Sequence, residues 1–363
     1  MELGILFIFI LSACILLFYW LKIFSKIYKV GQNQIDDSFR YPLSIIIAAK
    51  NEAGNIVNCL SSILNQDYPA FEIIVVDDHS KDKTKELISS LNSDKVKLFS
   101  SPNKCNGKKQ AIAFGITNAN YDHFVFTDAD CVPSSINWLS VINSSFLKGN
   151  NIVLGYGRFN KSNSILNRMI RYESLLTVIH YYSFTLNNDP YMGVGRNLAY
   201  SRELYESSIS TKNHEEILSG DDDLFVNQNS ERLKAGILLS MKAQTFSEPE
   251  PTIKSYFYQK RRQLIAGNYY KPKHRLLLAI YGISQLLFTS TLIGLVLFSQ
   301  QIILTFSIFG FVQLIQLYIF IRICKILGDK DLIYWKPFLE GLYIYIITII
   351  GISTWVWKVD RWK

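Results

Sequence analysis

Apolar runs of membrane-spanning length stand at both ends of the chain and constrain what it can fold into. Residues 3–21 carry no charged side chain, and a helix needs about 20 such residues to cross the hydrocarbon core of a bilayer. Three further runs lie near the other end, at 276–298, 302–321 and 338–357. We therefore expect an N-terminal transmembrane helix over 1–21, a globular domain over 22–275 and a membrane region over 276–363.

Charges beside the first run indicate the orientation expected in a membrane. Lys22, Lys26 and Lys29 follow this run at once, and basic residues are retained on the cytoplasmic side. A cleaved signal peptide usually has a basic start and a shorter apolar core, whereas this chain begins Met1-Glu2, so we expect an uncleaved helix. The expected location is the cell (inner) membrane, with several crossings and the globular domain facing the cytoplasm.

The last apolar run leaves two alternatives open. It contains Glu340 and is followed by Lys358, Arg361 and Lys363. A simple crossing would place these basic residues outside, against the usual bias. The segment is either a fourth crossing or a re-entrant or interfacial segment.

Composition excludes several classes of protein. The mean hydropathy of +0.13 is high for a soluble domain of 363 residues and low for a multi-spanning transporter. The net charge of +8 is explained by basic residues near helix ends, so we expect no nucleic-acid partner. The five cysteines are scattered without a CxxC pair, which argues against a disulfide framework and against structural zinc.

Within the globular part, short β-branched runs alternate with helical stretches. Strands are expected at Leu43–Ala49, Glu72–Val76, Val96–Phe99 and Phe124–Thr127, with helices near 53–65, 83–91 and 108–118. This alternation predicts an α/β fold with a mostly parallel sheet covered by helices on both faces. Ligands bind beyond the carboxyl ends of the strands in such sheets, and polar clusters follow three of the four predicted strands.

The cluster after the fourth strand contains Asp128 and Asp130, in the sequence TDADCVP. Two carboxylates at the end of a buried strand repel each other unless a cation lies between them, and hard ions such as Mg²⁺ or Mn²⁺ are the natural partners. A solvated acidic turn is the alternative. His123 and Cys131 are expected to be packing residues rather than ligands.

Two other clusters can serve a nucleotide. Asp77 and Asp78 end the second strand, where a carboxylate can accept hydrogen bonds from a ribose or a base, or else cap the next helix. Lys108 follows Gly107 at the start of a helix and can meet a diphosphate. This sequence is not a Walker A motif, because the leading glycine and the following Ser or Thr are missing.

The run Asp221-Asp222-Asp223 and the sequence QKRR at 259–262 lie farther along the chain. Three adjacent carboxylates repel one another, so one of them is expected to act as a general base, metal neighbour or hydrogen-bond acceptor. An exposed helix N-terminus is the alternative. The basic sequence is either a clamp on a leaving diphosphate or a patch at the membrane surface.

Seven stretches, read in order, resemble the family 2 glycosyltransferases with their GT-A nucleotide-binding fold. They are SIIIAAKNEAGNI, VVDDHSKDKT, GKKQAI, TDADC, GVGRNLAYSREL, SGDDDLF and QKRR, between Ser44 and Arg262. Apolar helices on either side of a cytosolic domain are also similar to the membrane-bound bacterial members. The resemblance implies an inverting, metal-dependent, hexosyltransferase-like enzyme. Such an enzyme would move a sugar from a nucleotide diphosphate sugar to a lipid-linked or polysaccharide acceptor in cell-surface glycan synthesis. UDP-sugar is the expected donor.

The resemblance also assigns residues. Asp128 and Asp130 would hold Mg²⁺ or Mn²⁺ as metal ligands. When Asp223-Leu224 is aligned with the family's trailing Asp-Leu, Asp221 becomes the catalytic base, and Asp222 is the alternative. The donor-binding residues would be Ala48, Asn51, Glu52, Asp77, Asp78, Lys108, Asp128, Gln259 and Arg262.

Departures from the family pattern and competing functions limit the hypothesis. Gln263 stands where tryptophan usually follows the Gln-x-x-Arg motif, which argues against a processive, polymer-extruding synthase. The alternative function is a non-catalytic nucleotide-sugar-binding membrane subunit of a glycan-synthesis complex. A membrane nucleotidyltransferase is a third possibility, which SGDDDLF followed by QKRR disfavours.

One helical segment, Ser164–Leu186, carries apolar residues in a stripe. This pattern is typical of a helix at the membrane interface, where a lipid-linked acceptor could be met, or of a helix packed in the core. Packing is the expected explanation.

Overall fold

A computed structural model describes residues 2–102, 107–208 and 222–356. The chain forms two compact units. One, here called the sheet unit, consists of Gln32–Asn160 and Asn188–Glu250. The other, here called the helical unit, contains the residues up to Gly31, then Lys161–Asn187 and the described residues from Pro251 onward. The domain limits predicted above, at residues 22 and 275, stay a prediction.

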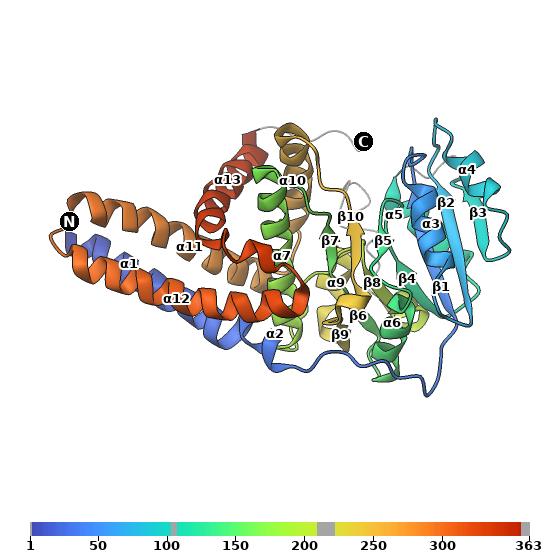
Figure 1. Ribbon diagram of the computed structural model, residues 1–363, viewed down its shortest axis with the longest axis horizontal. Coiled ribbons are helices and arrows are strands. Elements are labelled where there is room, and N and C mark those ends of the chain that lie inside the picture. The colour runs from blue at the N-terminus through green and yellow to red at the C-terminus, as the bar shows by residue number, and fades with distance from the viewer. Residues whose placement is uncertain (1, 103–106, 209–221, 357–363) are drawn as a thin grey trace. The chain divides into compact units, whose positions relative to one another are not determined.

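A seven-stranded sheet forms the centre of the sheet unit (Figure 1). All neighbouring strands are parallel except that β8 runs antiparallel to both β4 and β6. In the order across the sheet, the strands are β3 (Val96–Ser100), β2 (Phe71–Asp77), β1 (Leu43–Ala49), β4 (His123–Phe126), β8 (Leu198–Ser201), β6 (Ile152–Leu154) and β9 (Ala235–Ile237). The expected α/β fold with a mostly parallel sheet is confirmed.

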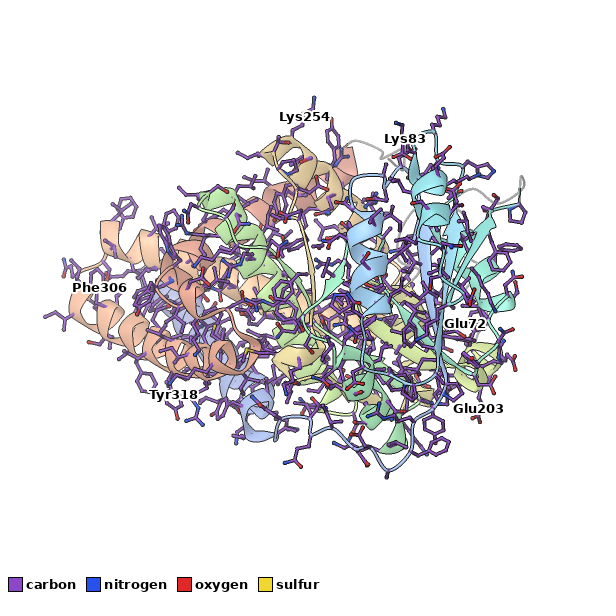
Figure 2. All side chains as sticks on the ribbon, turned by 45° about the vertical axis from the view of Figure 1, so that its right-hand side comes forward. Glu72, Lys83, Glu203, Lys254, Phe306 and Tyr318 are labelled. Carbon is purple, nitrogen blue, oxygen red and sulfur yellow. The ribbon has the colours of Figure 1, made fainter. Side chains whose placement is uncertain are left out.

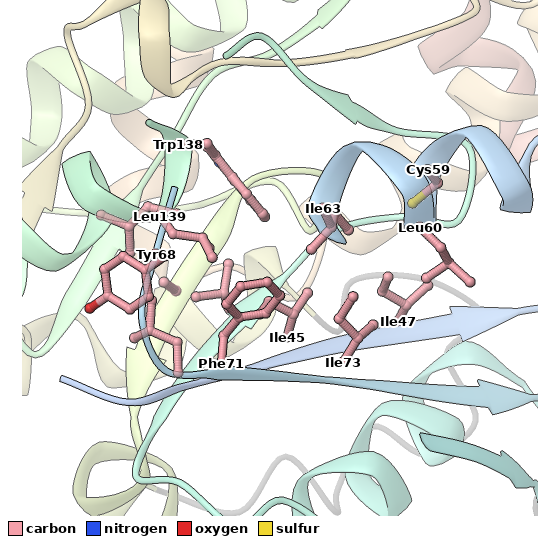
Figure 3. Close-up of a cluster of buried hydrophobic side chains, with 14 of the residues drawn as sticks. Ile45, Ile47, Cys59, Leu60, Ile63, Tyr68, Phe71, Ile73, Trp138 and Leu139 are labelled. Carbon is pink, nitrogen blue, oxygen red and sulfur yellow. The ribbon is translucent and has the colours of Figure 1, made fainter. Parts of the chain in front are cut away.

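Helices cover both faces of this sheet. The larger core packs one face of β1 and β2 against α3 (Ile56–Leu64) and α6 (Trp138–Leu147), as Figure 3 shows for side chains such as Ile45, Ile73 and Trp138. On the other face, α5 (Lys108–Thr117) packs so closely that a Cβ at Gly115 would lie 2.7 Å from a methyl group of Ile46. The remaining elements of the unit are α4 (Thr84–Ser90), β5 (Val132–Pro133), β7 (Gly157–Phe159), α8 (Arg202–Ser207), α9 (Asp223–Asn229), η3 (Ser230–Arg232), η4 (Met241–Ala243) and β10 (Thr245–Ser247).

A buried carboxylate near the start of β2, that of Glu72, joins three segments of the chain. Glu72, labelled in Figure 2, accepts hydrogen bonds from Ser44 Oγ and Lys97 Nζ, both at 2.7 Å. It also accepts from the backbone and side-chain nitrogens of Asn120, at 2.7 and 2.9 Å. Burial of this group raises its pKa, but the hydrogen bonds from Lys97, Ser44 and Asn120 outweigh that effect, so the pKa of Glu72 is lowered.

The helical unit contains four helical segments that are long and apolar enough to cross a membrane, among the described residues. The first, Glu2–Lys29, combines α1 (Glu2–Phe18), the π-helix η1 (Tyr19–Phe24) and α2 (Lys26–Lys29). The other candidate spans lie in α11 (Pro272–Phe298), α12 (Ile302–Leu327) and α13 (Lys336–Val356). Helix α12 exposes large apolar side chains, and Figure 2 labels two of them, Phe306 and Tyr318.

The segment Ser164–Leu186, with its apolar stripe, forms helix α7 (Ile165–Thr185). Its buried residues occur on all sides and include the polar side chains of Arg171, Glu173 and His180. It packs against η1, α2 and α13. The helix is therefore part of the core of its unit, and it does not present one free apolar face. The unit is completed by α10 (Ile253–Gly267) and η5 (Lys330–Leu332).

Candidate active site

The loops that follow β1 and β2 are joined by hydrogen bonds between side chains and backbone. The Asn51 backbone N–H donates to Ser80 Oγ at 2.9 Å, and the Lys81 N–H donates to Asn51 Oδ1 at 2.8 Å. The Glu52 N–H donates to Thr84 Oγ1 at 2.9 Å. Asn51 has a positive φ of 56°, a conformation that asparagine tolerates well. These bonds fix both loops at the carboxyl edge of the sheet, where a nucleotide is expected.

Two adjacent carboxylates at the end of β2 have different surroundings. Asp78 is buried and accepts from Lys50 Nζ at 3.0 Å, while its other oxygen lies 3.2 Å from His79 Nδ1. Asp77 is fully buried, and its Oδ2 lies 3.3 Å from Lys85 Nζ. Its Oδ1 has no hydrogen-bond partner within the described part of the chain. An unsatisfied buried oxygen is costly, so Asp77 offers an acceptor for a ligand N–H or O–H.

Asp128 and Asp130 lie together directly after β4. Their carboxylate oxygens and Cys131 Sγ are all within 4.8 Å of one another. Burial, together with the neighbouring charge of Asp128, raises the pKa of Asp130. A divalent cation would relieve this repulsion, so the two carboxylates fit a hard metal ion.

The expected packing residues near this pair are explained by burial. Cys131 is fully buried, which raises the pKa of its thiol, and sulfur is a soft ligand that a hard cation does not prefer. His123 stacks on Tyr41 with ring centroids 4.2 Å apart, and burial lowers its pKa. Both residues pack within the sheet unit, as predicted.

Lys108, the first residue of α5, connects the acidic pair to a second acidic residue. Its Nζ lies 2.6 Å from Asp128 Oδ1. A Cβ placed on Gly195 would lie 3.3 Å from Lys108 Nζ and 3.1 Å from Asp222 Oδ2. The Gly195 backbone N–H donates to Asp222 Oδ2, and the Asp223 N–H donates to Asp222 Oδ1 at 2.9 Å. The fold therefore brings Lys108, Asp128 and Asp222 to one place, although they are far apart in the sequence.

Two residues of the segment GVGRN, for which the sequence predicted no individual role, also belong to this site. Gly195 leaves the space beside Asp222, as described. Arg196 follows it, and its positive charge partly offsets the effect that raises the pKa of Asp130. The guanidinium lies 4.0 Å from the centre of the Phe159 ring and donates to Ser247 Oγ at 3.0 Å. The glycine pair in the sequence was the signal that could have identified this close approach.

The other predicted site residues fall in three places. Ala48, next to the last residue of β1, is half-buried at the carboxyl edge of the sheet, beside the loop that carries Asn51. Asp221 lies outside the described residues. Gln259 and Arg262 belong to α10 in the helical unit, so their role in donor binding stays a prediction.

A family model matches a region that includes most of the sheet unit and also α7 of the helical unit. The model of the family described as Glycosyl transferase family 2 matches residues 44–208. The chain contains a family 2 glycosyltransferase domain. The match includes the loops after β1 and β2, the pair Asp128 and Asp130, and Gly195, whereas Asp222 and the residues of α10 lie beyond it.

Curated relatives of this glycosyltransferase domain are polysaccharide synthases by name. The chain is 31% identical over 141 residues to a poly-beta-1,6-N-acetyl-D-glucosamine synthase of Staphylococcus epidermidis, covering 38% of this chain and 34% of that protein. The enzyme of the same name from Staphylococcus aureus is 31% identical over 140 residues, with the same coverage. The matched region thus spans about a third of the length of these curated relatives.

A solved structure supports the fold over nearly the whole chain. The chain is similar to a structure described as mannosyltransferase PcManGT from Pyrobaculum calidifontis in complex with GDP-Man and Mn²⁺, with a TM-score of 0.60. The similarity covers 97% of this chain and 98% of that one, at 16% sequence identity. The expected GT-A domain with apolar helices at both ends is therefore confirmed as a fold.

Proposed function

We propose that this protein is a membrane-bound, inverting glycosyltransferase, which moves a sugar from a nucleotide diphosphate sugar to a lipid-linked or polysaccharide acceptor in cell-surface glycan synthesis. UDP-sugar is the proposed donor. The observation that carries the proposal is the cluster of Lys108, Asp128, Asp130 and Asp222 at one edge of the sheet of a family 2 glycosyltransferase domain. A solvated acidic turn would not need a half-buried lysine, a glycine and a further carboxylate beside it.

The nucleoside is proposed to bind at the loops after β1 and β2, near Ala48, Asn51, Glu52, Asp77 and Asp78. Asp77 Oδ1 is a buried acceptor without a partner in the described chain, which suits a base N–H or a ribose hydroxyl. The hydrogen bonds between the loops hold this acceptor in place before the donor arrives. Preorganised groups bind with a smaller loss of entropy.

Asp128 and Asp130 are the proposed ligands of Mg²⁺ or Mn²⁺. When bound there, the ion would neutralise charge on the leaving nucleotide diphosphate. Lys108 places a second positive charge at the same carboxylate, so its ammonium can approach an incoming phosphate. Burial, and after it the charge of Asp128, raises the pKa of Asp130, and a cation would remove the repulsion between the two carboxylates.

The base is proposed to be Asp221, with Asp222 holding the start of α9. Both oxygens of Asp222 accept backbone N–H groups, and it is the N-cap residue of that helix. These two bonds engage the carboxylate in holding the backbone at Gly195 and at the start of α9. We therefore assign proton removal to its neighbour, as the family pattern implies.

The transfer is proposed to be a single displacement. The acceptor hydroxyl loses its proton to the Asp221 carboxylate as its oxygen forms the bond to the anomeric carbon. The bond from that carbon to the diphosphate oxygen breaks, and its electron pair leaves with the nucleotide. Because the attack comes from the side opposite the leaving group, the configuration inverts and no covalent enzyme intermediate forms. Gln259 and Arg262 are proposed to contact the departing diphosphate, for which arginine offers two parallel hydrogen bonds.

The domain is proposed to face the cytoplasm, attached to the cell (inner) membrane through the candidate spans of the helical unit. Basic residues support this orientation, since Lys22, Lys26 and Lys29 follow the apolar part of the first span. A membrane setting also suits a lipid-linked acceptor.

Radiolabelled nucleotide sugars test the function. Membranes containing the wild type or Asp221→Asn would receive each donor in turn with Mn²⁺ or Mg²⁺, and the products would then be partitioned between solvent phases. Label in the organic phase that requires Asp221 would establish a lipid acceptor and identify the donor sugar. Label in an aqueous polymer would indicate processive synthesis despite Gln263. Metal-dependent nucleotide binding without transfer of any sugar would favour the non-catalytic binding subunit.

A further inference from the structure

The last apolar helix, α13, is long enough to cross a membrane, but both of its ends are held by charged, non-spanning helices. The segment before it contains η5, which follows α12. The segment at its other end lies beside α10. These two attachments decide on which side of the membrane each end of α13 must lie.

The start of α13 is attached to α7. Arg171 of α7 is almost fully buried and donates to Asp331 Oδ1 and Oδ2 at 2.7 and 2.8 Å. It also donates to Asp329 Oδ1 at 2.8 Å. One turn earlier, the Arg168 guanidinium lies 4.5 Å from the centre of the Trp335 ring. The connection between α12 and α13 is therefore fixed on a helix that carries two arginines and is not among the candidate spans.

The end of α13 is attached to α10. Arg261 Nη2 donates to the Ser353 carbonyl oxygen at 3.3 Å, a buried contact near the last turn of α13. Helix α10 carries Lys254, Lys260, Arg261 and Arg262, so it cannot lie in the hydrocarbon core. It ends at Gly267, and the span α11 begins at Pro272. The end of α13 thus lies on the side of the membrane from which α11 starts.

Both ends of α13 are consequently on one side. Helix α11 leaves this side and α12 returns to it, because only Ser299-Gln300-Gln301 separates the two helices. The connection after α12 is on the same side, and so is α10. In Figure 1, α13 runs across the direction shared by α1, α11 and α12, and it packs against α7, α10 and α11. A spanning helix would instead end next to the tip of the α11–α12 hairpin.

The two faces of α13 suit this position. On the buried face, Lys336 Nζ donates to Glu340 Oε2 and Gln316 Oε1 at 2.8 Å each, and to Gln313 Oε1 at 3.2 Å. On the other face, Phe338, Ile349 and Ile352 are more than half exposed. Their spacing places them on one stripe of the helix. A helix with its charges turned inward and its apolar side chains exposed matches lipid rather than water.

We infer that α13 does not cross the membrane and instead lies within the cytoplasmic leaflet, with the stripe of Phe338, Ile349 and Ile352 against lipid acyl chains. The described part of the chain then crosses the membrane three times. This inference rests on the orientation given under the proposed function. It also removes the conflict noted in the sequence, because Lys358, Arg361 and Lys363 then follow a helix that ends on the cytoplasmic side.

Two epitope tags in the full chain test the topology. One tag is added after Lys363, and in a second protein the same tag is inserted between Gln300 and Gln301. External protease is applied to right-side-out and to inverted membrane vesicles. The two tags should be digested from opposite sides, with the tag after Lys363 digested only in inverted vesicles. Digestion of both tags from the same side would show that α13 crosses, and would overturn the inference.

Photo-crosslinking tests the lipid contact. p-Benzoylphenylalanine would be incorporated at Ile349, which is 62% exposed, and at the neighbouring Ile350, which is 2% exposed. Irradiation in membranes of radiolabelled phospholipid should yield a lipid adduct at position 349 and far less at position 350. Equal or absent adducts at the two positions would contradict a lipid-facing stripe. Neither experiment requires sugar transfer, so an inactive protein with this topology would disprove the proposed function and leave the inference intact.

Discussion

Replacing Arg171 by methionine should strongly destabilise the helical unit. The side chain of Arg171 is 2% exposed and makes three hydrogen bonds to two aspartates. Methionine keeps most of the apolar volume of the arginine stem but removes the charge. The substitution therefore isolates the contribution of the guanidinium to the stability of the segment between α12 and α13.

The size of the effect follows from the different burial of the two aspartates. Asp329 is 1% exposed, so losing the charge of Arg171 should cost about 3–5 kcal/mol, as for other buried pairs that lose one partner. Asp331 is 30% exposed and also lies 3.3 Å from Lys161 Nζ, so it should add little. In a unit of this size, the loss corresponds to a fall in Tm of about 10 °C.

The pH dependence of this contribution has a defined sign. The hydrogen bonds from Arg171 lower the pKa of Asp331 to about 2, from an ordinary value of 3.8. A lowered pKa in the folded state contributes stability above the unfolded value, and that stability is lost as pH falls toward the folded value. Because Asp331 contributes only a small part of the loss, the difference in Tm between wild type and Arg171→Met should narrow only slightly from about pH 4 to pH 2.

Thermal unfolding in detergent, followed by near-ultraviolet circular dichroism, would measure the loss. Arg168→Met is the matched control on the same helix, because its contact with the Trp335 ring is worth only about 1 kcal/mol. If Arg171→Met lowered Tm no more than Arg168→Met does, the reasoning about the buried ion cluster would be wrong.

Three further predictions concern the sheet unit. Gly195→Ala should lower sugar transfer by at least about tenfold with little change in Tm, because the Cβ of the new alanine would lie 3.1 Å from Asp222 Oδ2. Unchanged sugar transfer would contradict the placement of Asp222 in the site. Glu72→Ala should lower the stability of this unit by about 2–4 kcal/mol, because it leaves the buried Ser44 hydroxyl without its acceptor and removes the partner of Lys97. Glu86 is exposed on α4, so Glu86→Ala is the control, and a loss of stability no larger than that of Glu86→Ala would refute the network. Chelation of divalent ions should abolish sugar transfer by the wild type. Asp130→Ala should lose both sugar transfer and metal-dependent nucleotide binding. Full sugar transfer by the wild type in the presence of a chelator would show that the reaction needs no metal ion.

The alternation of strands and helices was predictable because each element has a local pattern. The strand at Leu43–Ala49 has the predicted bounds, and the next three strands differ from their predicted ends by one residue. The antiparallel placement of β8 was not predicted. Its direction is set by pairing with β4 and β6, and pairing between distant segments has no local signal.

Site residues were predictable where they directly follow a predicted strand in the sequence. They were harder to predict where contacts between distant parts of the chain bring them together. Asp128 and Asp130 follow a strand directly, so their role at the sheet edge could be predicted. The pairing of Lys50 with Asp78 joins residues 28 positions apart and was missed. The position of Asp222 beside Lys108 likewise depends on the approach of Gly195, which only the folded chain reveals.

The central claim is that Asp221 acts on the acceptor while a separate set of residues binds the donor. The most direct test measures sugar transfer and nucleotide binding in the same membranes for wild type, Asp221→Asn and Asp222→Asn. The account predicts that Asp221→Asn lowers transfer by about 10²–10⁴-fold, the range of a lost general base, while nucleotide binding is kept. Full transfer by Asp221→Asn, or loss of nucleotide binding by a folded Asp221→Asn protein, would contradict the account.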